Sequence, residues 1–111
     1  MKRSWRYVPL GIFALLLAAV MFLRYLGTEQ HSVTLTWQAP VLRSGLTLVG
    51  YNVYRRTAEG GSFVKIADKV SGPPYEDRLV GRGRRYVYVV TSVDKTGRES
   101  RFSAEAKAEI P

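Results

Sequence analysis

YVYVVTSV, at residues 86–93, is the stretch that decides the fold class of this 111-residue chain. It consists of β-branched, aromatic and small residues, and turn residues bound it on both sides, with Gly83 before it and Asp94–Gly97 after it. Such a run fits a pleated, half-buried surface better than a helix. The stretch therefore predicts a central β-strand whose inward face consists of Tyr86, Tyr88 and Val90.

Further short strands surround this one in the sequence. Apolar and polar residues alternate from Val33 to Gln38, and a second strand is expected at 50–54. Shorter strands are expected at 63–66 and 75–77, and an alanine-rich last strand at 103–110. Short strands separated by turns favour an all-β sandwich over a βαβ fold. The expected core residues are Trp37, Tyr51, Val53, Tyr86, Tyr88 and Val90.

The N-terminal segment has a different character. Val8 to Leu23 runs 16 residues without a charge, after a basic start at Lys2, Arg3 and Arg6. About 20 apolar residues cross a bilayer, and flanking basic residues mark the cytoplasmic side. We therefore predict a single-pass membrane protein, in which a cytoplasmic N-terminus (1–7) precedes a transmembrane signal-anchor helix (8–26). A short linker (27–31) would then lead to an extracytoplasmic domain (32–111).

A cleaved signal peptide is the alternative, since it also has a basic start and an apolar middle. Cleavage requires small residues at the third and first positions before the cut. A cut after Gly27 would place Tyr25 at the third position, and no Ala-x-Ala follows the apolar run. We therefore expect a retained anchor, with a secreted domain as the alternative.

Charge and composition exclude several classes. Of the net charge of +8, Lys2, Arg3, Arg6 and Arg24 contribute four at the flanks of the apolar segment, which leaves +4 for the rest. This distribution argues against a nucleic-acid partner. Cysteine is absent, so disulfides and thiolate metal sites are excluded.

Several motifs follow one another in a characteristic order: VTLTWQAP (33–40), GYNVYRR (50–56), Tyr75–Asp77, GRRYVYVVTSVD (83–94), GRES (97–100) and Ser103. Together they resemble the successive signatures of a fibronectin type III domain, from about residue 31 to 111. The resemblance implies an immunoglobulin-like β-sandwich in which Trp37 fills the core from strand B. It also implies a tyrosine corner between strands E and F, made by Tyr86 six residues after Val80.

The chain departs from the family pattern at two places. Arg82 stands where the family has proline. Only residues 27–31 separate the predicted helix from strand B, so strand A is expected to be short or missing. An uncovered strand B would present an edge at Ser32, Thr34 and Thr36 to which a partner strand could pair.

No set of residues in the sequence converges on chemistry. His31, the only histidine, has no nucleophile or carboxylate near it in sequence, so we expect a solvated linker residue. The carboxylates form no recognisable catalytic pair or calcium loop, and Asp77 is expected to accept backbone or arginine hydrogen bonds near a strand end. We therefore expect no enzyme, no cofactor, no metal and no small-molecule substrate. Tyr54 is the one tyrosine of the predicted strands expected to point outward.

The leading hypothesis is a membrane-anchored interaction module with an unidentified protein partner. The alternative is a secreted or surface accessory domain that binds polysaccharide or cell wall. In the topology that the resemblance implies, the turn bearing Arg82, Arg84 and Arg85 shares a pole with the start of strand B, where the chain would leave the bilayer. We therefore predict that these arginines contact the membrane surface.

Overall fold

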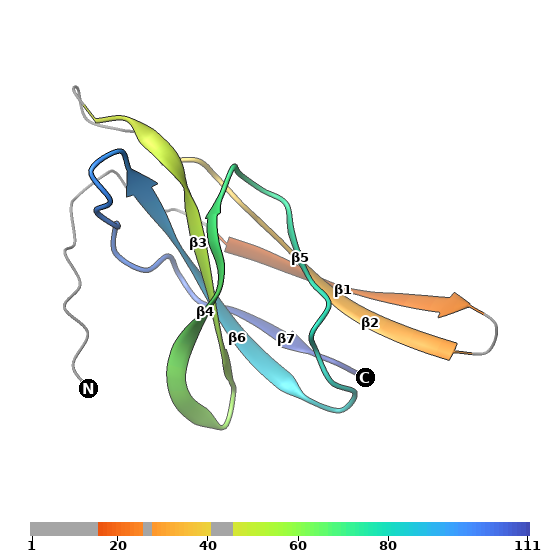
Figure 1. The fold of residues 1–111 in the computed structure, drawn as a ribbon. Coiled ribbons are helices and arrows are strands. Elements are labelled where there is room, and N and C mark those ends of the chain that lie inside the picture. The colour runs from red at the N-terminus through yellow and green to blue at the C-terminus, as the bar shows by residue number, and fades with distance from the viewer. Residues whose placement is uncertain (1–15, 26–27, 41–45) are drawn as a thin grey trace.

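The computed structural model describes residues 16–25, 28–40 and 46–111, and in these ranges the chain is an all-β sandwich (Figure 1). One sheet has the order β1-β2-β5, formed by β1 (Leu16–Tyr25), β2 (Thr28–Trp37) and β5 (Tyr75–Asp77). The other has the order β4-β3-β6-β7, formed by β3 (Leu48–Thr57), β4 (Gly60–Val70), β6 (Arg85–Asp94) and β7 (Ala106–Glu109). Neighbouring strands are antiparallel throughout.

The stretch that decides the fold class forms β6, in the middle of the larger sheet. β6 pairs with β3 from Leu48 to Thr57, and with β7 over its first four residues. Its inward side chains meet those of β2 and β3, and the Trp37 and Tyr51 rings lie edge to face at 5.3 Å. All six expected core residues lie in this buried cluster, together with Val33, Leu35, Ala106, Ala108 and Ile110.

Beyond β7, two serines replace a strand along β6. Ser103 accepts a hydrogen bond on Oγ from the Val90 N–H and donates its own N–H to the Val90 carbonyl, both at 2.9 Å. Ser100 makes the same pair of bonds with Ser92, also at 2.9 Å. The backbone groups of Val90 and Ser92 are therefore satisfied on this side of β6, although β7 pairs only with its first four residues.

The structure differs from the prediction in the apolar segment. Leu16–Tyr25 is a strand, and it pairs with the whole of β2 rather than continuing a helix. An apolar run without periodicity does not distinguish a strand from a helix, and here the free edge of β2 supplies the backbone partners. The rest of the predicted helix, 8–15 and 26, lies outside the described residues. No helix in the described part of the chain is long and apolar enough to cross a bilayer.

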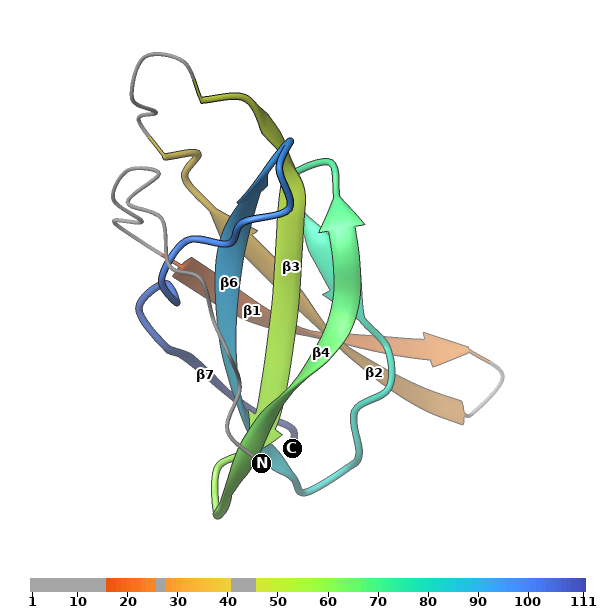
Figure 2. The ribbon, with the colours of Figure 1, turned by 60° about the vertical axis from the view of Figure 1, so that its left-hand side comes forward.

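The predicted linker and the predicted open edge differ from the structure for the same reason. Residues 28–31 are the first residues of β2, so His31 lies in a strand, where it is half-buried. Ser32, Thr34 and Thr36 are in register with β1 residues, so the edge predicted to be open is paired in this arrangement. The β1–β2 ribbon runs obliquely behind the larger sheet and extends past it (Figure 2).

Candidate functional site

One end of the sandwich gathers four segments that are far apart in the sequence. The Ala58 N–H donates to the Arg85 carbonyl at 2.9 Å, which joins the β3–β4 turn to the start of β6, directly after the β5–β6 connection. Gly83 and Arg84 of that connection exchange hydrogen bonds with Ile110, at 2.9 and 2.8 Å. β2 also begins at this end, because it runs antiparallel to β5 with Val33 opposite Asp77. We call residues 78–85 at this end the arginine turn.

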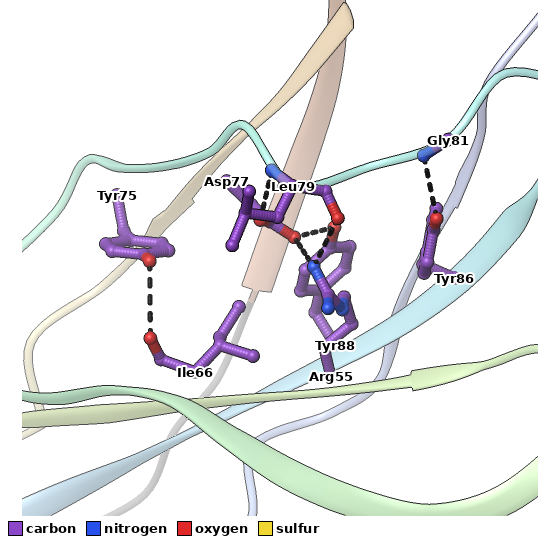
Figure 3. Close-up of polar contacts among 8 residues, drawn as sticks. All are labelled: Arg55, Ile66, Tyr75, Asp77, Leu79, Gly81, Tyr86 and Tyr88. Carbon is purple, nitrogen blue, oxygen red and sulfur yellow. Dashed lines mark hydrogen bonds and ion pairs between the residues drawn. The ribbon is translucent and has the colours of Figure 1, made fainter.

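A buried carboxylate connects the two sheets beneath the arginine turn (Figure 3). Asp77, on β5, is only 3% exposed, and its Oδ2 lies 2.7 Å from Nη1 of Arg55 on β3. The hydroxyl of Tyr88, on β6, donates to the same oxygen at 2.7 Å. Sequence reasoning expected Asp77 to bind an arginine or the backbone but did not identify Arg55. Arg55 follows Tyr51 and Val53 at a spacing of two, so its inward position was the available signal.

This network is accompanied by raised pKa values of Tyr88 and Arg55. Burial, and then the hydrogen bond to Asp77, raise the pKa of Tyr88. Burial alone would lower the pKa of Arg55, but the hydrogen bond and charge of Asp77 outweigh it and the pKa is raised. Both shifts favour the protonated forms, so Tyr88 and Arg55 act as hydrogen-bond donors to Asp77 at neutral pH.

The same network fixes the backbone of Leu79. Its N–H donates to Oδ1 of Asp77 at 3.1 Å, and its carbonyl accepts from Nη1 of Arg55 at 2.9 Å. The Leu79 side chain is nevertheless 82% exposed. Two residues further on, the Gly81 N–H donates to the Tyr86 hydroxyl at 2.8 Å, which is the tyrosine corner that the resemblance implied.

The arginines of the turn are exposed and differ in their partners. Arg85 lies 2.9 Å from Glu59, and Arg78 lies 3.0 Å from Glu76, both at the surface. Arg82 and Arg84 form no ion pair with any carboxylate that the structure describes. The turn is therefore a basic surface around one exposed apolar side chain.

On the outer face of the larger sheet, the structure differs from the prediction for Tyr54. Tyr54, expected to point outward, is fully buried: it donates to Oε1 of Glu99 at 2.7 Å, and Phe102 packs on it with ring centroids 5.4 Å apart. A shallow depression of about 540 Å³ lies beside it on β3, β6 and β7, lined by both signs of charge: Arg56, Arg85, Lys107, Glu105 and Glu109.

Glu99 and Asp94 have structural partners. Glu99 also accepts from Thr91 at 2.7 Å. Burial would raise the pKa of Asp94, but hydrogen bonds from Thr96 and from the Arg98 backbone outweigh it and lower the pKa. Within the described ranges no three His, Cys, Asp or Glu side chains gather as a metal site would require.

The sandwich, with its tyrosine corner and serine-closed β6 edge, defines an immunoglobulin-like class of module. The chain is 30% identical to an Fn3-like protein from Clostridium thermocellum of known crystal structure, with 91% of this chain and 96% of that chain covered and a TM-score of 0.62. The chain therefore belongs to the fibronectin type III-like family. No family model matches it.

Two further comparisons extend this result. Titin module A71 from human cardiac muscle, 19% identical with 89% of each chain covered, shares the fold with a TM-score of 0.69. An amylopullulanase from Thermoanaerobacterium saccharolyticum is 46% identical over 59 residues, which cover 53% of this chain and 5% of the amylopullulanase. The chain thus matches a small part of a much longer protein.

Proposed function

We propose that the chain is a non-catalytic accessory module that makes protein contacts outside the cytoplasm. The burial of its aromatic side chains carries this proposal. From residue 30 onward, the described aromatic residues are buried or half-buried, and the exposed large apolar side chains are only Val49, Val64 and Leu79. Ligand sites are concave and lined with aromatic and apolar groups, and the surface described here lacks such a lining.

The similarity to amylopullulanases supports an accessory role. The matched stretch makes up 5% of one of these proteins and 4% of another, from Thermoanaerobacter thermohydrosulfuricus. A segment of that size is a module beside other parts of the protein. The similarity to amylopullulanases also favours a second candidate function, in which the module itself binds polysaccharide. The burial of the aromatic side chains argues against this second function.

The proposal also includes attachment of the module to a membrane. The uncharged run from Val8 to Leu23 and its basic flanks support an anchor. The helix over 8–26 and β1 cannot form in the same molecule, because both use residues 16–25. In the anchored form β2 would lose its β1 partner, and Ser32, Thr34 and Thr36 would become an edge for a strand of the protein partner.

Two measurements test these proposals. The full chain should pass unretarded through gels containing polysaccharide, whereas retardation that soluble sugar competes away would replace protein contact by polysaccharide binding. The anchor predicts a carbonate-resistant membrane fraction and an intact mass that includes Met1. A mature chain beginning near Thr28 would instead identify a secreted module.

A further inference from the structure

Leu79 is the most exposed large apolar side chain that the structure describes, and basic residues surround it in the chain. It is 82% exposed, whereas Val64 and Val49 are 62% and 46% exposed. Arg78 precedes it, and Arg82 and Arg84 follow within the same turn. Val80, the other apolar side chain of the turn, packs against the core, so Leu79 is the exposed apolar residue of 78–85 and a candidate contact residue.

The position of Leu79 is fixed from beneath. Its N–H and its carbonyl are both bound, at 3.1 and 2.9 Å, by the buried Asp77–Arg55 pair. The tyrosine corner holds Gly81 two residues later. The turn is therefore ordered before it meets any partner, so docking costs little conformational entropy.

The charge of the turn selects the partner. Three carboxylates lie on its flanks: Glu76 and Glu59 are paired with Arg78 and Arg85, and Glu109 lies opposite Arg85 on β7. Arg82 and Arg84 are exposed and have no described carboxylate partner. The surface around Leu79 therefore complements an anionic surface.

We infer that the arginine turn docks on the surface of an anionic lipid bilayer, with Leu79 entering the headgroup region. One apolar side chain within basic residues is typical of interfacial attachment, whereas a stable protein interface buries about 1,200 Å² or more. The inference rests on the proposed membrane attachment for one purpose, which is to bring this end of the sandwich close to a bilayer. In the anchored form the chain would leave the bilayer just before β2, and β2 begins at this end.

The test uses the full chain carrying an environment-sensitive fluorophore. The chain has no cysteine, so Leu79→Cys gives a single labelling site, and Val49→Cys at the other end of β3 gives a matched control. Each labelled protein is placed in nanodiscs of neutral phosphatidylcholine and in nanodiscs that also contain phosphatidylglycerol. We expect a blue shift and higher emission at position 79 on anionic discs only, and no change at position 49.

Removal of charge and addition of salt then measure the electrostatic contribution to docking. Because each arginine near an anionic surface changes partitioning about fivefold, Arg82→Ser with Arg84→Ser should shift the docking equilibrium by roughly 25-fold. Salt at about 1 M, where the Debye length is ~3 Å, should produce a similar loss. Lys65→Ser with Lys69→Ser, on β4, removes the same charge elsewhere and should leave the response intact.

Four results would overturn the inference: no response at position 79 on anionic discs, an equal response on neutral discs, an equal response at position 49, or an equal response to soluble polyglutamate without lipid. The last would make an acidic protein the partner. A failure of the proposed anchor can be distinguished from a failure of the docking. The chain would then not co-elute with neutral discs, while the label at position 79 would still report docking on anionic vesicles.

Discussion

The two sheets of the sandwich differ in how they are held together. In the larger sheet β3 is paired along both sides, with β4 and β6, and β6 is closed by β7 and the two serines. In the smaller sheet β5 meets β2 over three residue pairs, and β1 pairs with β2 alone. The smaller sheet contacts the larger one through side chains of β2, through Tyr75 and through Asp77.

This difference indicates which part of the molecule can rearrange. The larger sheet is a complete hydrogen-bonded unit, whereas β1 adds one edge to a narrow sheet. An apolar segment that leaves β1 would uncover β2 without breaking any pair of the larger sheet. The core of the sandwich would therefore be retained in the anchored form that we propose.

Hydrogen exchange measures directly how stably the strands of each sheet are paired. We expect the β6 amides to exchange only through global unfolding, and the amides of 28–32, which lie beyond the β5 pairing, to exchange by local opening. The difference should be about 100-fold or more, which corresponds to a local opening several kcal/mol easier than unfolding. Equal protection of both strands would show that the smaller sheet is as firmly held as the larger one.

Removing the link between the sheets should give the largest loss of stability among substitutions. Asp77→Ala leaves Arg55 half-buried without its carboxylate and should lower the free energy of unfolding by about 3 kcal/mol, measured by urea titration. Glu76→Ala, which removes an exposed pair with Arg78, is the control and should change stability by less than about 0.5 kcal/mol. Similar effects of both would mean that Asp77 does not join the sheets.

The serine closure of β6 should be the next most sensitive feature. Ser103→Ala leaves the buried Val90 N–H without an acceptor and should cost about 1.5 kcal/mol. Ser62→Ala, at an exposed β4 position, is the matched control. If thermal unfolding of the Ser103 variant matched the parent, water would be a sufficient partner for this edge.

Alkaline pH should weaken the link between the sheets. The pKa of Tyr88 is higher in the folded chain than its ordinary value of about 10, so its contribution to stability is complete below pH ~10 and is lost as pH rises above it. Tyr88→Phe should cost about 1 kcal/mol at pH 7 and make the decline above pH 10 shallower by about one proton. An unchanged alkaline slope would assign that decline to other tyrosines.

The arginine turn should matter least for folding. Arg82→Ser with Arg84→Ser removes exposed side chains without ion pairs and should change stability by less than about 0.5 kcal/mol. A loss above 1 kcal/mol would show that these residues serve the fold and would weaken their assignment to a surface contact.

The larger sheet could be predicted from the sequence because its strands alternate or are bounded by turns. The expected strand at 86–93 corresponds to β6, which has one more residue at each end. In the smaller sheet, the expected strand Tyr75–Asp77 is β5. The apolar run at 16–25 could not be assigned in this way, because continuous apolarity carries no period. Its strand depends on pairing with β2, from Tyr25 opposite Thr28 to Leu16 opposite Trp37, and the composition of the apolar run alone does not reveal that partner.

The candidate site was predicted in part. The basic turn and the tyrosine corner follow from local sequence, and the role of Asp77 as an acceptor was anticipated. The exposure of Leu79 was not, because its neighbours in the chain do not reveal that Arg55 and Asp77 hold its backbone. Contacts between residues 22 and 24 positions apart leave no local pattern.

The bonds between Ile110 and the arginine turn have a mechanical consequence. A force that pulls the C-terminus away from the sandwich loads the Gly83 and Arg84 bonds first, and then the four residue pairs of β7, one after another from Glu109 to Ala106. Antiparallel strands pulled apart from one end open like a zipper, so this end should yield at low tension while β3 and β6 stay paired. Tension on the C-terminus would release the arginine turn first and would then draw Ile110, Ala108 and Ala106 out of the core.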